Sequence, residues 1–230
     1  LYFKYKFKNL GVQKYNRFVA LSNESLQEWD VMNCTIIPNP SWLKVTADNP
    51  LENKKVITVA RNSYEKGLDR LLLIWQKIAL KHPDWVLEIY GDGLKPLETV
   101  AEKLKMSSTV KFNNPVLNIE KIYKEASLFV MTSRFEGFPM VLLEAMASGL
   151  PCVAYDCPVG PKAIITNGKN GFLVPEGKEQ LFIEQLSVLM TDMVLRKKLG
   201  INARESVADY DLDIIMLQWN ALFENVIKNN

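Results

Sequence analysis

From residue 56 to residue 192 the sequence alternates short, β-branched segments with longer amphipathic ones. The short segments are typical of strands, because Val, Ile and aromatic residues are enriched there. The longer segments are typical of helices, because their apolar residues recur every three or four positions. Strands and helices that alternate at this spacing form a parallel sheet with right-handed crossovers. The sequence therefore predicts an α/β fold built on a doubly wound parallel sheet.

The alternation defines one large unit, which we place at residues 41–210. Its expected strands span 56–60, 85–91, 110–112, 128–133, 151–155 and 171–174. Its expected helices span 67–82, 95–106, 118–126, 139–149 and 178–192. Ligands of such sheets lie at the carboxyl ends of the strands, near the point where the strand order reverses. Candidate functional residues are therefore those that directly follow a strand.

The two ends of the chain have a different pattern. Residues 16–22 are strand-like, residues 23–29 begin a helix with Ser22 or Asn23 as its cap, and residues 34–40 are extended. We expect residues 1–40 to be the last part of a preceding domain, followed by a hinge. We expect residues 211–230 to form a separate C-terminal element, with one long amphipathic helix over 211–227. The chain also starts without a methionine, so we expect a fragment or a processed protein.

The composition excludes several classes of protein. The 28 Lys and Arg residues nearly balance the 26 Asp and Glu residues, so a net charge of +2 gives no reason to expect a nucleic-acid partner. No stretch approaches the roughly 18 apolar residues that a membrane span requires. Lysines interrupt the first ten residues, LYFKYKFKNL, which do not resemble a signal peptide. Residues 2–8 could be a basic, aromatic membrane-surface anchor or an ordinary helix or strand.

Cysteine and histidine usage narrows the chemistry further. The three cysteines, Cys34, Cys152 and Cys157, are odd in number and lack the spacing of a metal site. We expect reduced thiols and a cytoplasmic location. The single histidine, His82, precedes Pro83 at the end of a helical segment, and we interpret it as an ordinary surface residue. A zinc site made of several histidines is therefore excluded.

Two cations follow the first expected strand, at Arg61 and Lys66, and flank the turn that opens the next helix. Helix N-terminal amides and cationic side chains both attract negative charge. The pattern is consistent with a diphosphate site, and the alternative is a solvated basic pair in a loop.

Gly91-Asp92-Gly93 follows the second expected strand. A dinucleotide-binding fingerprint would need a third glycine three positions further on, where the sequence has Pro96. The third strand runs into Asn113 and Asn114 rather than into the acidic residue that such enzymes use. The sequence therefore disfavours a nicotinamide-dependent enzyme, and the glycines indicate close backbone approach or a tight turn.

Two glutamates, Glu136 and Glu144, belong to the stretch that follows the fourth strand. Glu136 and Gly137 stand at the mouth of the next helix, and Pro139 suits its first turn. Glu144 lies deeper, among Val, Leu, Ala and Met residues. A carboxylate in such surroundings is costly unless it accepts hydrogen bonds, and paired ribose hydroxyls are suitable donors. The alternative is that Glu144 lies on the solvent face of the helix.

An acidic pair, Asp211-Leu212-Asp213, opens the terminal helix. Such a pair can hold a metal–nucleotide complex, but its position at a helix start favours helix capping.

Several of these motifs occur together in the order of one known family. They are Arg61…Lys66-Gly67, Gly91-Asp92-Gly93, Glu136-Gly-Phe-Pro…Glu144-Ala-Met-Ala-Ser-Gly-Leu-Pro, and Gly171-Phe-Leu-Val-Pro175. They resemble the C-terminal, Rossmann-like half of a GT-B glycosyltransferase of family 4 (glycosyl transferases group 1), and the likeness spans about residues 34–227. The resemblance implies a retaining enzyme that uses a nucleotide-sugar donor.

The resemblance also implies a role for each matching residue. Arg61 and Lys66 would hold the donor diphosphate and stabilise the leaving nucleotide, and Glu136 would contact the transferred sugar. Glu144 would accept hydrogen bonds from the ribose hydroxyls. The backbone at Gly91 and around Asn113, with Phe112 and Asn114, would contact the nucleotide. The remaining implied contacts, at the mouth of the helix, are Gly137, Phe138, Pro139 and Met140.

The expected activity follows from these roles. The chain resembles the donor-binding part of a hexosyltransferase that uses a UDP-sugar to build a polysaccharide, and it needs no metal or other cofactor. Its partners would be the nucleotide sugar and a glycan or lipid-linked acceptor, the latter bound by an N-terminal domain of which residues 1–33 resemble only the end. The fragment alone would be inactive, and contact with the cytoplasmic face of a membrane is conceivable.

Two alternatives stay open. The chain could be a nucleotide-sugar-binding module without transfer activity, or a GT-B sugar-nucleotide epimerase, which the single histidine disfavours. The sequence also departs from the family at Gly160-Pro161-Lys162, where many relatives continue with a glutamate and this chain has Ala163.

Overall fold

The computed structural model describes residues 15–27, 29, 31, 33–44 and 49–228. The segment at residues 2–8, interpreted above as a possible membrane anchor, lies outside the described residues. Within the described residues, no helix is long and apolar enough to cross a membrane.

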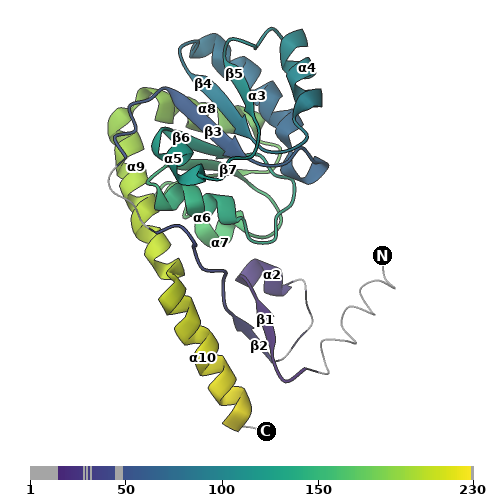
Figure 1. Cartoon of the computed structure of the whole chain (residues 1–230), viewed down its shortest axis with the longest axis vertical. Coiled ribbons are helices and arrows are strands. Elements are labelled where there is room, and N and C mark those ends of the chain that lie inside the picture. The colour runs from purple at the N-terminus through teal and green to yellow at the C-terminus, as the bar shows by residue number, and fades with distance from the viewer. Residues whose placement is uncertain (1–14, 28, 30, 32, 45–48, 229–230) are drawn as a thin grey trace.

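The main body is an α/β unit built on a parallel six-stranded sheet, which confirms the predicted fold class (Figure 1). The strands lie in the order β5-β4-β3-β6-β7-β8. The chain therefore builds outward from β3 to one edge, returns to β6 beside β3, and continues to the other edge. The order reverses between β3 and β6, where a ligand crevice is expected at the carboxyl ends of the strands. The strands are β3 (Lys55–Val59), β4 (Val86–Tyr90), β5 (Val110–Asn113), β6 (Leu128–Met131), β7 (Cys152–Asp156) and β8 (Gly171–Pro175).

Helices cover both faces of this sheet. Because side chains alternate along a strand, Leu128 and Val130 of β6 enter the core on one face, and Phe129 and Met131 enter the core on the other. The first core holds α3 (Leu68–Lys81), α4 (Lys95–Lys103) and α8 (Glu179–Thr191). The second core holds α5 (Ile119–Lys124), α6 (Met140–Ala147) and α7 (Pro161–Ile164). A short 3-10 helix, η1 (Tyr64–Lys66), precedes α3.

The sequence pattern did not predict the short helix α7. It also did not predict α9 (Met193–Ser206), which is followed by the 3-10 turn η2 (Val207–Tyr210). The apolar periodicity of α9 is interrupted by Arg196, whose guanidinium is buried and donates to the carbonyls of Leu51, Leu189 and Met190. A helix whose inner face contains an arginine lacks a clear apolar stripe, and this explains the missed prediction.

The N-terminal residues form a small unit of their own. Strands β1 (Phe18–Ala20) and β2 (Cys34–Ile36) pair in parallel, and α2 (Asn23–Gln27) lies between them in the chain. The Ser22 hydroxyl accepts from the Ser25 backbone N–H, so Ser22 caps α2 rather than Asn23. Figure 1 shows this unit beside the terminal helix α10 (Leu212–Lys228). Ile37, Ile215 and Leu222 form the buried contact between them.

Several side predictions can be compared with the structure. The Asp211 carboxylate accepts from the Asp213 backbone N–H at 2.9 Å, which confirms helix capping. No group of three His, Cys, Asp or Glu side chains suited to a metal ion occurs among the described residues. All three cysteines are free, although Cys34 is only half-buried. His82 ends α3 and is partly exposed, as expected for an ordinary residue.

Candidate active site

Two loops at the carboxyl edge of the sheet bring the predicted residues together. The first follows β3 and carries Arg61 and Lys66, and the second follows β6 and carries Glu136. Because β3 and β6 are neighbours on either side of the strand-order reversal, these loops meet at the expected crevice. The sequence prediction placed these residues in the segments that follow β3 and β6, and the topology makes these two strands neighbours.

Lys66 and Glu136 are in direct contact. The Lys66 ammonium lies 2.7 Å from Oε1 and 2.8 Å from Oε2 of Glu136. The Ser133 hydroxyl donates to the same Oε1 at 2.6 Å. The carboxylate is 6% exposed, so its charge is compensated by an ion pair and a hydrogen bond. Lys66 and Glu136 were predicted to bind different parts of one ligand. In the structure they contact each other directly.

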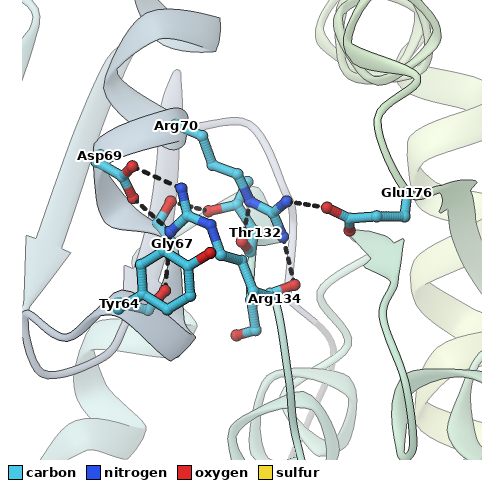
Figure 2. Close-up of polar contacts among 8 residues, drawn as sticks. Tyr64, Gly67, Asp69, Arg70, Thr132, Arg134 and Glu176 are labelled. Atoms are coloured by element: carbon cyan, nitrogen blue, oxygen red, sulfur yellow. Dashed lines mark hydrogen bonds and ion pairs between the residues drawn. The ribbon is translucent and has the colours of Figure 1, made fainter.

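Arginine side chains fasten the two loops to each other, as Figure 2 shows. Arg70 of α3 donates to the carbonyls of Thr132 and Ser133 and pairs with Glu176, which follows β8. Arg134 forms a two-pronged ion pair with Asp69 at 2.8 and 2.6 Å. The hydrogen bond from Arg134 is the main cause that holds the pKa of Asp69 below its usual value. The loop that carries Glu136 is thus held from both sides.

Two glycines allow the loops to approach closely. Gly67 has φ +62°, and a Cβ built there would lie 2.1 Å from the Thr132 carbonyl oxygen. Gly160 has φ +104°, and its Cβ would lie 2.6 Å from Cδ of Pro139. By contrast, a Cβ at Gly137 would meet nothing within 4 Å, so the space in front of the helix mouth is open. The close packing at Gly67 and Gly160 therefore contrasts with the open space at Gly137, which is exposed.

Glu144 is buried on α6 with 8% exposure, so the alternative that it lies on the solvent face is wrong. Its Oε1 accepts from the Trp42 indole N–H at 2.7 Å, and its Oε2 accepts from the Tyr123 hydroxyl at 2.9 Å. Burial, and then the neighbouring Glu144 carboxylate, raise the pKa of Tyr123 well above its usual value, so the tyrosine remains a donor. A buried carboxylate requires hydrogen-bond donors, and Trp42 and Tyr123 supply them from within the protein.

The other predicted residues occupy three positions around the crevice. Arg61 is exposed, and the loop that carries it is held by Asn62, which donates to the carbonyls of Asp92 and Gly93. Gly91 touches this loop, since a Cβ there would lie 2.0 Å from the Ala60 carbonyl oxygen. At the helix mouth, Phe138 and Pro139 are buried and Met140 is half-buried, and Phe138 packs on Tyr210.

Asn113 ends strand β5, and its buried Nδ2 has no hydrogen-bond partner among the described residues. Phe112 and Asn113 border a hollow of about 400 Å³ between β5 and α4. A buried amide without a partner is unusual in a folded protein, and Asn113 is therefore a residue of interest at this end of β5.

The sequence reasoning did not identify the residues that support the predicted ones. Ser133 and Arg134 lie three and two positions before Glu136, but nothing in the spacing shows that Ser133 contacts Glu136 and that Arg134 contacts α3. Trp42 and Tyr123 reach Glu144 from 102 and 21 positions away in the sequence. Such contacts have no local signal and require the tertiary structure.

The family model of glycosyl transferases group 1 matches residues 44–206, which include Arg61, Lys66, Asn113, Glu136 and Glu144. The chain belongs to this family. Members of the family are sugar-transferring enzymes, so the prediction of a glycosyltransferase is confirmed at this level.

Relatives of this glycosyltransferase chain are longer than it is. An uncharacterized glycosyltransferase of Haemophilus influenzae is 31% identical over 222 residues, which cover 94% of this chain and 63% of the relative. The amylovoran biosynthesis glycosyltransferase AmsD of Erwinia amylovora is 36% identical over 172 residues, covering 74% of this chain and 48% of that protein. The chain thus spans between about half and two thirds of these curated relatives.

A solved structure supports the fold of this glycosyltransferase chain. A mutant of S. aureus TarM, crystallised with fondaparinux, alpha-GlcNAc-glycerol and UDP, matches with a TM-score of 0.83 and 25% identity. The match covers 93% of this chain and 45% of TarM. The resemblance to the GT-B fold is confirmed by this similarity.

Proposed function

We propose that this chain is the donor-binding part of a hexosyltransferase that uses a nucleotide sugar, with UDP as its nucleotide, and retains the anomeric configuration. The observation that carries the proposal is the Lys66–Glu136 pair at the carboxyl edge of the sheet, beside the open space at Gly137. The UDP bound to TarM supports the choice of nucleotide. The acceptor would be a glycan or a lipid-linked sugar, bound largely by residues outside this chain.

In the proposed reaction, the bond between the anomeric carbon and the diphosphate oxygen breaks, and its electron pair leaves with UDP. The acceptor oxygen bonds to the anomeric carbon on the same face, and its proton passes to the released diphosphate. Arg61 and Lys66 neutralise the charge that develops on the diphosphate. Glu136 holds the hydroxyls of the transferred sugar, and so orients the anomeric carbon.

Further contacts of the proposed complex follow from the donors and acceptors at the crevice. Glu144 accepts from the ribose hydroxyls, because each carboxylate oxygen has lone pairs beyond the ones used by Trp42 and Tyr123. The backbone around Asn113, at the end of β5, would contact the base. The backbone at Gly91, and residues Gly137 to Met140 at the helix mouth, line the remainder of the donor site.

We also propose that donor binding requires no divalent metal, since Arg61 and Lys66 supply the positive charge that the diphosphate needs. The proposed location is cytoplasmic, with a peripheral contact to the membrane where the acceptor is lipid-linked. The chain by itself is proposed to bind the donor without transferring it, because it spans only part of its relatives.

Calorimetric titration of the chain with UDP, GDP and ADP tests this function. We expect UDP to bind, with the other two nucleotides at least about tenfold weaker, the difference expected when one hydrogen bond to the base is lost. Addition of EDTA should leave UDP binding unchanged. Loss of UDP binding with EDTA would refute metal-independent binding. Robust sugar transfer by the chain alone would refute the proposal that this chain binds the donor without transferring it.

A further inference from the structure

The contact between Lys66 and Glu136 joins two segments that are not strands of the sheet. Lys66 is the last residue of η1, and Glu136 lies in the loop that follows β6. Lysine is a flexible side chain with four rotatable carbons, so a fixed ammonium position needs a fixed backbone around it. The question is which residues fix it.

Arg134 contacts the chain on both sides of Lys66. Its backbone N–H donates to the Glu65 carbonyl at 2.7 Å, and its guanidinium donates to the Tyr64 carbonyl at 2.8 Å. The guanidinium also lies 4.4 Å from the centre of the Tyr64 ring and pairs with both oxygens of Asp69. Tyr64 and Glu65 directly precede Lys66, and Asp69 follows it by three positions (Figure 2).

These contacts are better suited to fixing a position than to supplying stability. The side chain of Asp69 is 61% exposed, and ion pairs this exposed contribute little to folding. The planar guanidinium, however, places its donors in fixed directions, so one side chain can determine the relative position of several groups. Glu136 is two residues from Arg134, and any shift of this loop moves the carboxylate relative to the ammonium.

We propose that Arg134, oriented by Asp69, is a positioning residue that holds the Lys66 ammonium in register with Glu136 and therefore at the donor diphosphate. Arg134 acts through Lys66 and does not itself touch the donor. This inference rests on the proposed function, which places Lys66 at the diphosphate.

A double-mutant cycle on UDP affinity tests the inference. We expect Lys66→Met to weaken UDP binding about ten- to hundredfold, as for a lost hydrogen bond to a charged group. Arg134→Ala should weaken it about five- to tenfold, within the range of coupled neighbouring residues. In the Lys66→Met background, Arg134→Ala should have no further effect, because the group through which it acts is gone.

Milder variants and a local probe separate positioning from folding. Asp69→Asn keeps the size of the side chain and should reproduce part of the Arg134→Ala effect, while Arg134→Lys should recover only part of the affinity. Lys197→Ala removes one cation from an exposed ion pair with Glu52 and should leave UDP affinity unchanged. Without nucleotide, the ¹H–¹⁵N signal of the Lys66 ammonium, assigned with Lys66→Met, should weaken in Arg134→Ala and Asp69→Asn.

The possible results distinguish the two proposals. If Lys66→Met leaves UDP affinity unchanged, the proposed function has misplaced Lys66, and the inference fails with it. If Lys66→Met weakens binding but Arg134→Ala does not, or if their effects simply add, the inference fails while the proposed function stands. An unchanged Lys66 ammonium signal in both Arg134→Ala and Asp69→Asn would also overturn the inference.

Discussion

The two buried glutamates near the carboxyl edge of the sheet differ in the groups that contact them. Glu136 and Glu144 are both buried carboxylates eight positions apart. Glu136 is paired with a cation, whereas the donors to Glu144 among the described residues, Trp42 and Tyr123, are neutral. The two glutamates therefore have different surroundings, and different roles are proposed for them.

Substitution of each glutamate by glutamine should separate these roles. We expect Glu144→Gln to weaken UDP binding about ten- to hundredfold, because a charged acceptor for the ribose is lost. Glu136→Gln should change UDP affinity by less than about threefold, or 0.7 kcal/mol, and should instead lower turnover in a longer, transfer-competent protein. Titration calorimetry measures both affinities, and the opposite order of effects would show that the assignments are reversed.

Tyr123 links this site to stability at high pH. Since its pKa in the folded protein is raised, its contribution is fully present below the unfolded value of about 10 and is lost as the pH rises above it. We expect Tyr123→Phe to cost about 1–3 kcal/mol at neutral pH, because one oxygen of Glu144 loses its donor. Denaturant unfolding at neutral pH and above pH 10 should show this cost shrinking with pH, whereas a constant difference would contradict the assignment.

At the scale of elements, the crevice depends on how closely η1 and α3 approach the end of β6. The closest approach is at Gly67, which combines a left-handed backbone with a carbonyl oxygen only 2.1 Å from the position of a Cβ. Thr132 reinforces the contact, since its hydroxyl donates to the Gly67 carbonyl at 3.0 Å. The glycine that follows Lys66 is therefore required by packing as well as by backbone conformation.

Gly67→Ala tests this packing, with Gly177→Ala as its control. Gly177 has a similar φ of +77° but open space around its Cβ position, so alanine there costs only the left-handed conformation, about 1–2 kcal/mol. Gly67→Ala should cost about 1–3 kcal/mol more, because the methyl group meets the Thr132 carbonyl. Urea unfolding of the two variants gives the difference directly, and equal costs would mean that the loops can separate without loss.

At the scale of the whole molecule, α10 connects the small N-terminal unit to the main body. One face of the helix packs on that unit through Ile215 and Leu222, with Trp219 and Val226 beside them. Another face leaves Leu212, Leu217, Phe223 and Ile227 exposed. The six-stranded sheet, by contrast, has two hydrophobic cores of its own, so we expect it to stay folded without this contact.

Leu222→Asp should therefore release the small unit without unfolding the large one. A buried charge at this contact has no partner, and burying it is unfavourable. Hydrogen exchange should show loss of amide protection in β1 and β2, with protection kept from β3 to α9. Leu217 lies on the same helix and is 68% exposed, so Leu217→Asp should leave both units protected. Loss of protection throughout after Leu222→Asp would show that the units fold together.

The sequence by itself determined the layered architecture and indicated candidate residues for the site. Strand and helix periodicities are local properties, so the order of the six strands and of helices α3, α4, α5, α6 and α8 could be predicted before any contact was known. The short helix α7 was not predicted. Gly91, the two cations and Glu136 also occur in the segments that follow strands, and Glu144 lies in the helix that follows one of them. Helix α9 was not predicted, because the buried Arg196 interrupts its apolar pattern. The burial of Arg196 is explained by the carbonyls to which it donates, and these are seen only in the tertiary structure.

The tertiary structure decided which of these residues meet and what holds them. Strand order made β3 and β6 neighbours, and only then could Lys66 contact Glu136 across 70 positions of sequence. The donors to Glu144 and the contacts of Arg134 likewise come from distant segments. Hydrogen bonds and ion pairs act over a few ångströms of space, whereas a sequence records only neighbours along the chain, and for this reason the supporting residues could not be predicted from the sequence.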